Sequence, residues 1–387
     1  MYEQATDSAK LAPVQSKAQI YMDHNGSAPT HPNARRAMMP YLAFAYGNPS
    51  SGHWAAEKAK QTVENARKSV ASLIGAQSNE IVFTSGATEA NNMVIKGVFG
   101  PNNSAGRHII TSAIEHEAVA KPIRSLKSQG VRTTTVPVDE KGIIDPAAVE
   151  DAITPNTGLI SIMFANNEIG TIQPIAEIAA LAARKNIPFH TDAAQAVGKV
   201  PVDVKKLGVD FLSLAGHKFG APNGIGALYI RSGRKLSPLL HGAGHERGRR
   251  AGTESALLAA GLDAAAIAAT NKDQSDVRNL RDYFWNCLKQ NFGDRVVLNG
   301  HALKRVPNTL SVSFPGQVGA EILSAMPHLA ATTGSACHAG CIDMSHVLIA
   351  MGKSVDIGMG TIRFSLGAEN TYEEVDRTIQ DLHGILN

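Results

Sequence analysis

The chain of 387 residues has few cysteines, little net charge and no long apolar run, and each shortage excludes a class of protein. Three cysteines, an odd number, do not make the disulfide framework of a small secreted protein, so we expect a reducing compartment and a cytoplasmic location. The 37 basic side chains nearly balance the 34 acidic ones, and nothing in the composition requires a nucleic acid partner.

The apolar segments are too short for a signal peptide or a membrane span. Residues 1–19 carry four charged side chains and no apolar block of the length that a signal peptide needs. The most apolar later stretch, residues 256–270, is rich in alanine and is interrupted by Gly261 and Asp263. We therefore expect no membrane partner.

The composition that remains is that of a globular protein, with 43% hydrophobic residues and a length that predicts two or three domains. Short apolar runs typical of strands alternate with helical patterns such as residues 55–74 and 175–185. The runs lie at 80–85, 107–112, 158–165, 186–191, 209–214 and 226–230. Strands that are apolar on both faces and separated by helices predict an α/β fold with a mainly parallel central sheet.

The pattern changes after about residue 270. A polar break at 271–276 is followed by a helical stretch, two strand-like runs, a glycine-rich segment at 334–340 and a closing strand before a C-terminal helix. We interpret this as a smaller α+β domain. The predicted division is a large domain of residues 28–270 and a small domain of residues 1–27 plus 271–387.

Ligands of parallel α/β proteins bind beyond the carboxyl ends of the strands, so the residues that follow each apolar run are the first candidates for a site. The run at 80–85 is followed by Gly86, Ala87 and Thr88 and then by a helical pattern. Free backbone N–H groups at such a helix start could hold a phosphate. A plain helix capped by Thr88 is the alternative.

Polar side chains follow three more of the runs. His116 follows the second run and could be a hydrogen-bonded structural residue, and Asn167 follows the third, where a polar turn is the alternative. Asp192 follows the fourth run, with Gln195 three residues later. A carboxylate there could meet a cationic ring nitrogen, although a helix-capping aspartate would have the same sequence.

A lysine follows the run at 209–214, in the segment Gly216, His217, Lys218. A lone lysine is usually a solvated surface charge. A lysine in a glycine-flanked turn, an acid at another strand end, a phosphate-type glycine turn and a histidine are, however, the parts of a pyridoxal phosphate (PLP) site.

The small domain supplies a second group around Cys337, among small residues at 333–341. A thiol there could reach a substrate, but it attacks only as the thiolate, so it needs a cationic neighbour. Two alternatives are an inert cysteine and a metal site. The metal set would be Cys337, His338, Cys341 and His346, whose spacing fits no usual zinc pattern.

One arginine lies inside an apolar run, and several common motifs are missing. Arg363 could clamp a carboxylate through two hydrogen bonds, with a structural ion pair as the alternative. No GxGxxG follows a strand, and GxSxG, the P-loop and HExxH are absent. Nicotinamide enzymes, serine hydrolases, NTPases and zinc peptidases of the HExxH type therefore lack their usual support.

Taken together, these residues resemble the NifS-like cysteine desulfurases and selenocysteine lyases, which belong to the class V aminotransferases of PLP fold type I (aspartate aminotransferase-like). The similarity runs nearly from end to end. Its segments are YMDHN (21–25), GNPSS (47–51), EIVFTSGATEANN (80–92), EHEAV (115–119), NNEIGTIQPI (166–175), HTDAAQAVGK (190–199), GHK (216–218), HERGRRAGT (245–253), TGSAC (333–337) and IRFSLG (362–367).

The resemblance implies PLP as the cofactor, no metal, and a homodimer. Lys218 would be the Schiff-base lysine, Asp192 the partner of the pyridine nitrogen and Gln195 the ligand of the ring hydroxyl. His116 would stack on the ring, and Thr253 would reach the cofactor of the partner subunit. The full set of cofactor-binding residues would be Ala87, Thr88, His116, Asn167, Asp192, Gln195, His217, Lys218 and Thr253.

The resemblance also implies conversion of L-cysteine to L-alanine, with a persulfide on Cys337 that is passed to an acceptor protein. Lys218, Cys337 and His116 would be catalytic, and Asn167 and Arg363 would bind the substrate. Selenocysteine lyase is the alternative activity, because His338 after Cys337 is similar to those enzymes. A non-catalytic scaffold or sulfur-relay protein is a further alternative.

This sequence departs from the family pattern at three places. Ala215 stands where the family has a hydroxyl residue before GHK, and residues 25–29 read Asn-Gly-Ser-Ala-Pro where Asn-Ala-Thr-Thr-Pro is usual. Cys341 has no counterpart in the family pattern.

Overall fold

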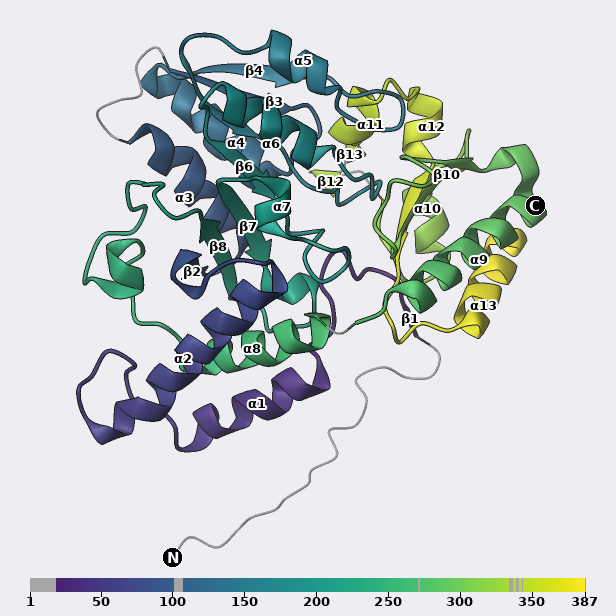
Figure 1. Ribbon diagram of the computed structural model, residues 1–387. Helices are drawn as coiled ribbons and strands as arrows, with labels where there is room; N and C mark the ends of the chain where they lie inside the picture. The colour runs from purple at the N-terminus through teal and green to yellow at the C-terminus, as the bar shows by residue number, and fades with distance from the viewer. Residues whose placement is uncertain are drawn as a thin grey trace, which may run out of the picture.

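The computed structural model describes residues 19–100, 107–270, 272–333, 337–338, 341–342 and 344–386, with the backbone alone at 337–338 and 341–342. The chain forms a large α/β lobe and a smaller lobe built around its C-terminal part (Figure 1). No helix in the described ranges has both the length and the apolar character that a membrane span needs.

The large lobe is built on a seven-stranded sheet in the order β2-β8-β7-β6-β5-β3-β4. All neighbouring pairs are parallel except those of β8, which runs opposite to both β2 and β7. The strands are β2 (Ile81–Thr84), β3 (His108–Ser112), β4 (Arg132–Val136), β5 (Thr157–Ser161), β6 (Phe189–Asp192), β7 (Phe211–Ala215) and β8 (Gly226–Ile230). The prediction of a mainly parallel sheet is confirmed.

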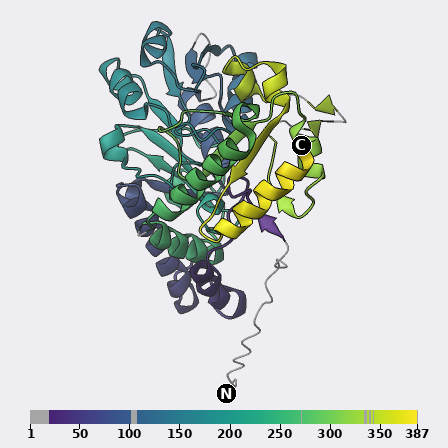
Figure 2. The same cartoon turned by 90° about the vertical axis from the view of Figure 1, so that its right-hand side faces the viewer.

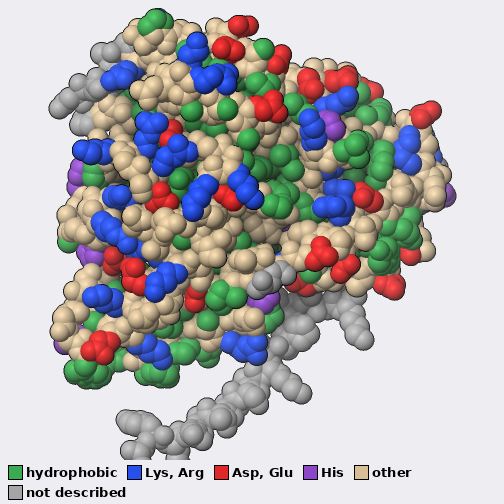
Figure 3. Space-filling view, viewed as in Figure 1, with side chains coloured by type: hydrophobic (Ala, Val, Ile, Leu, Met, Phe, Trp, Pro, Cys, Tyr) green, Lys and Arg blue, Asp and Glu red, His purple; other side chains and the backbone are tan. Residues whose placement is uncertain are grey.

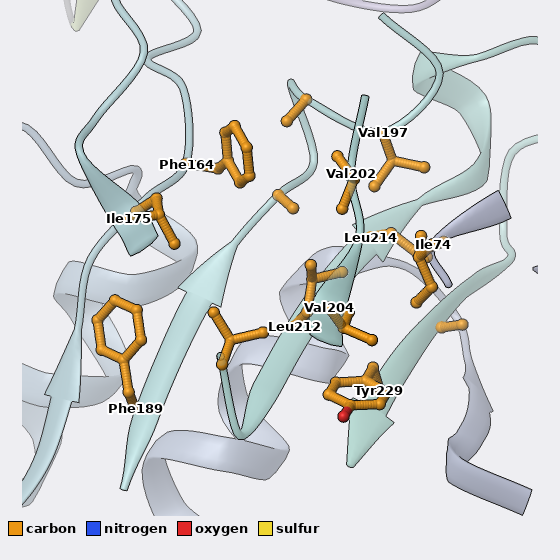
Figure 4. Packing of buried hydrophobic residues seen from close by; sticks show 14 of the residues in the cluster. Ile74, Phe164, Ile175, Phe189, Val197, Val202, Val204, Leu212, Leu214 and Tyr229 are labelled. Atoms are coloured by element: carbon orange, nitrogen blue, oxygen red, sulfur yellow. The ribbon is translucent and has the colours of Figure 1, made fainter. Parts of the chain in front are cut away.

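Helices cover both faces of this sheet because alternate strand residues enter two different apolar clusters. Leu212 of β7 packs on one side, with α2, α6 and α8, and Phe211 packs on the other, with α3 and α4. Figure 4 shows the first cluster, in which Leu212 lies between Phe189 and Val204, and Leu214 lies beside Ile74. The helices are α1 (Pro32–Ala43), α2 (Trp54–Leu73), α3 (Ala87–Phe99), α4 (Glu117–Leu126), α5 (Pro146–Asp151), α6 (Ile175–Arg184), α7 (Val204–Leu207) and α8 (Ala256–Thr270).

The small lobe has its own apolar core beside an antiparallel sheet in the order β14-β10-β9. Helices α9 and α13 pack side by side against this sheet (Figure 2), and Phe284 of α9 contacts Phe364 of β14 with ring centroids 4.8 Å apart. The elements are α9 (Ser275–Phe292), β9 (Val297–Leu298), β10 (Thr309–Ser313), α10 (Gly319–Ser324), α11 (His346–Ala350), α12 (Val355–Met359), β14 (Thr361–Ser365) and α13 (Tyr372–Leu386).

The two lobes are joined at both ends of the small one. Near the N-terminus, β1 (Ile20–Tyr21) pairs in parallel with β11 (Leu329–Ala330), and Ile20 and Met22 enter the core of the small lobe. Val347 of α11, in contrast, packs on Ile114 of the large lobe. Between Met22 and α1 the chain passes from the small lobe to the large one, and Asn25 and Gly26 on this path line the cavity described below.

Candidate active site

A cavity of about 490 Å³ lies at the carboxyl ends of the central strands, where the small lobe meets the sheet. It is lined by every cofactor-binding residue predicted from the sequence except Thr253, and by Arg363 from the small lobe. Thr253 lies in an exposed segment before α8, outside this cavity. Residues that are far apart in the chain thus share one cavity of the size that small-molecule sites have.

Lys218 enters the cavity from a short turn, Gly216–Lys218, directly after β7. Its Nζ donates to the backbone oxygens of Asn25 at 2.7 Å and Gly26 at 2.8 Å. Burial and the nearby Arg363 charge lower the pKa of this amine to about 8, against the opposing effect of the Asp23 and Asp192 carboxylates. The amine is therefore much closer to its nucleophilic, neutral form at neutral pH than a solvated lysine is.

Asp192 ends β6 and is buried, with 6% of its surface exposed. Its Oδ2 accepts a hydrogen bond from Asn91 Nδ2 at 2.7 Å, and its Oδ1 accepts one from the backbone N–H of Ala194 at 3.0 Å. Two donors hold the carboxylate in place beside the cavity. A carboxylate fixed in this way can keep a heterocyclic nitrogen protonated.

The glycine turn predicted as a phosphate site opens α3, and no side chain caps this helix. The structure thus disagrees with the alternative of a helix capped by Thr88. Gly86 has φ of 152°, in the region that favours glycine, and a Cβ there would face open space. His217 lines the same cavity, and burial and the neighbouring Lys218 charge lower the pKa of its ring. A phosphate fits this uncapped helix start.

His116 has both a structural and a cavity-facing position. Its Nδ1 accepts a hydrogen bond from the backbone N–H of Ala118 at 3.0 Å and so caps α4. The ring also lines the cavity. Since Nδ1 is the acceptor, the neutral ring carries its proton on Nε2.

Arg363, in the middle of β14, reaches the cavity from the small lobe. Its Nη1 donates to the backbone oxygen of Asn167 at 2.9 Å, and its Nη2 pairs with the Asp23 carboxylate. Its Nε is buried and has no hydrogen-bond partner within the described part of the chain. The guanidinium is thus part of a structural ion pair, and it also offers donor capacity at the cavity.

The sequence reasoning missed the residue that links these groups, Asn25. Its carbonyl accepts from Lys218, its Nδ2 donates to the backbone oxygen of Asn167 at 3.1 Å, and its Oδ1 accepts from Lys199 Nζ at 2.7 Å. Asn25 and Lys199 lie inside matched segments, but no local pattern distinguishes them from surface polar residues. Asn91 was missed for the same reason.

The backbone at Cys337–His338 forms β12, which pairs antiparallel with β13 at Cys341–Ile342. The side chains of these residues lie outside the described part, so the role of Cys337 and the alternative metal set stay predictions. On the C-terminal side of this hairpin, His346 Nε2 lies 3.0 Å from the backbone oxygen of Glu115. Among the described side chains, no cluster of three or more His, Cys, Asp or Glu could hold a metal ion.

The fold and the cavity together define a class of protein, the PLP-dependent enzymes of fold type I. In that class a lysine bonds to the cofactor, a carboxylate faces the ring nitrogen and a helix start receives the phosphate. This cavity presents Lys218, Asp192 and the uncapped start of α3 in those three positions, so the residues present fit PLP.

Comparison with known proteins narrows the class to a family. The chain belongs to the aminotransferase class V family, whose model matches residues 20–378. A cysteine desulfurase IscS of Methanosarcina thermophila is 46% identical over 366 residues, which cover 93% of this chain and 90% of that protein. A cysteine desulfurase of Rattus norvegicus is 42% identical over 385 residues, which cover 97% of this chain and 85% of that protein.

Solved structures show the same relationship. A NifS-like protein superposes with a TM-score of 0.88 and 35% identity, over 95% of this chain and 99% of that one. The protein SspA in complex with cysteine superposes with a TM-score of 0.81 and 36% identity, over 90% of this chain and 98% of that one.

Proposed function

We propose that the protein is a PLP-dependent cysteine desulfurase that converts L-cysteine to L-alanine and transfers the sulfur atom to Cys337. One observation carries the proposal: Lys218, Asp192 and Arg363, which come from three separate strands or strand ends, line a single cavity. The curated relatives named cysteine desulfurase and the solved complex of SspA with cysteine support cysteine as the substrate.

PLP, when bound, supplies an electron sink that stabilises negative charge at the substrate Cα. The chain provides the surroundings that this chemistry needs. Asp192 would hold a proton on the ring nitrogen, and the backbone N–H groups at the start of α3 would bind the phosphate. The buried position of Asp192 strengthens its interaction with a cationic nitrogen.

Lys218 and Arg363 act on the substrate. The Lys218 amine, whose pKa is lowered to about 8, takes the Cα proton at Nζ and later returns a proton to the product. Arg363 binds the substrate carboxylate and thereby fixes which bond at Cα is cleaved. Asn167, whose backbone oxygen already accepts from Arg363, lies beside this carboxylate site.

Sulfur transfer requires the Cys337 thiolate. It attacks the substrate sulfur, the bond between that sulfur and Cβ breaks, and the electron pair of the broken bond is protonated to give the methyl group of alanine. One sulfur atom moves from cysteine to Cys337, so no external oxidant or reductant is needed. We further propose that a protein acceptor in the reducing cytoplasm then takes the sulfur.

A homodimer is part of the proposal, since Thr253 lies outside the cavity of its own subunit. Large apolar side chains are exposed at the end of α1, in the loop that follows it and at the start of α2, along the lower edge of Figure 3. They include Phe44 at 65%, Tyr46 at 81% and Trp54 at 82% exposure. Exposed apolar patches of this kind mark contact surfaces. Ser50, between Tyr46 and Trp54, lines one surface pocket with residues 243–247 of the segment before Thr253, so this segment lies next to the exposed apolar patch.

The experiment is mass spectrometry of the intact protein after exposure to L-cysteine. We expect one added sulfur atom on the wild-type chain and on Cys341→Ala, and none on Cys337→Ala. A persulfide that persists in Cys337→Ala would contradict the proposal. Faster release of selenide from L-selenocysteine that survives Cys337→Ala would instead favour the selenocysteine lyase suggested by His338.

A further inference from the structure

Lys199 is a buried lysine that the proposed mechanism does not use. Only 8% of its surface is exposed. Its Nζ donates to Gln195 Oε1 at 2.6 Å and to Asn25 Oδ1 at 2.7 Å, and no carboxylate pairs with it in the described ranges. Burial lowers its pKa well below the usual value, and the Lys218 and Arg363 charges lower it further. The amine therefore donates to both of its neighbours.

These contacts determine how the Gln195 amide is oriented. An amide can exchange its oxygen and nitrogen by a half-turn, and the two orientations differ only in their hydrogen bonds. The two N–H donors of the amine face acceptors, so Lys199 favours the orientation in which Oε1 points toward it. Gln195 Nε2 then donates one hydrogen to the backbone oxygen of Asn25 at 3.1 Å. The second hydrogen of Nε2 is left for another acceptor, and the Gln195 side chain lines the cofactor cavity.

We infer that Lys199 is a positioning residue, which fixes the Gln195 amide so that an N–H donor faces the oxygen on the cofactor ring. The inference rests on the proposed function in that the ligand of the cavity is PLP. Lys199 itself lines a second cavity on the other side of Lys218, together with Lys272, and acts on the cofactor only through its neighbours.

A merely structural role of Lys199 makes a different prediction. In that case Lys199→Met should lower the free energy of unfolding of the apoprotein, because the buried Gln195 Oε1 loses its donor, and should leave the PLP affinity of the folded protein unchanged. A positioning role predicts that the same variant binds PLP more weakly, because the Gln195 amide is then free to present its oxygen to the ring oxygen.

The test is a double-mutant cycle on the dissociation constant of PLP, measured by fluorescence titration of the full-length apoprotein. Lys199→Met and Gln195→Leu are each expected to raise this constant about tenfold, the size of one good hydrogen bond. In the Gln195→Leu background, Lys199→Met should add less than a twofold change. Lys272→Met, which removes an exposed lysine from the far cavity, is the matched control and should leave the constant unchanged.

Three outcomes would overturn the inference: an unchanged dissociation constant in Lys199→Met, effects that multiply in the double variant, or an equal loss in Lys272→Met. Should Lys199→Met not fold, Lys199→Gln is measured in the same cycle, with the same expectation, because its shorter amide does not reach both acceptors. A wild-type chain that binds PLP but makes no alanine would refute the proposed function alone and leave the cycle interpretable.

Discussion

Lys218 should become a nucleophile at a lower pH than a solvated lysine does. Burial and Arg363 lower the pKa of its amine from 10.5 to about 8. The cation loses its proton as the pH rises through about 8, and the neutral amine then bonds to an aldehyde. At pH 7 about one amine in ten is neutral with this pKa, against about one in three thousand with the ordinary value, a gain of roughly 300-fold in reactive form.

The measurement is the rate at which PLP becomes covalently attached to the apoprotein between about pH 6 and pH 9.5. Samples are reduced with borohydride, and the labelled peptide is identified by mass spectrometry, with Lys218→Ala as the blank. We expect the rate to rise about tenfold per pH unit and to level off near pH 8. The Asp23 carboxylate favours the Lys218 cation, so Asp23→Asn should lower the pH at which the attachment rate levels off. A rate that still rises tenfold per unit at pH 9.5 would refute the lowered pKa.

Three other substitutions probe the site and its support. Arg363→Leu should lower kcat/KM for L-cysteine by roughly 100-fold, which corresponds to the loss of about 3 kcal/mol of carboxylate binding, while PLP affinity changes little. Arg363→Lys should recover part of the loss, and equal activity of the wild type and both variants would rule out the carboxylate role. Glu246→Ala should lower the free energy of unfolding by about 3–5 kcal/mol in urea denaturation, because Arg67 then stays buried without the carboxylate that lies 2.7 Å from it. Arg67→Met combined with Glu246→Leu should cost much less, and a loss below about 1 kcal/mol in Glu246→Ala would contradict this reasoning. Gly86→Ala should weaken PLP binding about tenfold through backbone strain at the helix start. Gly233 also has a positive φ and open space around it but lies outside the cavity, so Gly233→Ala should leave PLP binding unchanged.

The central strands could be predicted from the sequence because both of their faces are buried. In β6 and β7 every residue is buried. β7, FLSLA, reads as an apolar run with one polar interruption, whereas β6, FHTD, was predicted from the apolar residues at 187–189, because its other three residues are polar although they are buried. β4 was not predicted, since its segment RTTTV is exposed at one edge of the sheet and has no such run. The direction of β8 was also hidden, because antiparallel and parallel strands in a buried sheet have the same local composition.

The main candidates of the site could be identified for a similar reason. Asp192 and Lys218 follow apolar runs directly, and the carboxyl ends of parallel strands meet at one edge of a sheet, so their positions along the chain already suggested a shared site. Arg363 was noticed as a charge inside an apolar run. The resemblance to a family then added roles to these residues, and for Cys337 and Thr253 those roles remain predictions.

Buried strands and the polar residues at their ends leave a pattern in the local sequence. The amino-acid order alone therefore determined the α/β class and identified the lysine, the aspartate and the glycine turn as site residues. The tertiary structure decided which polar groups support them. Asn25 lies 174 residues from Lys199 and 193 residues from Lys218, yet it bonds to both. Burial of an amine without a carboxylate, and the orientation of an amide beside it, depend on which distant segments the packing brings together.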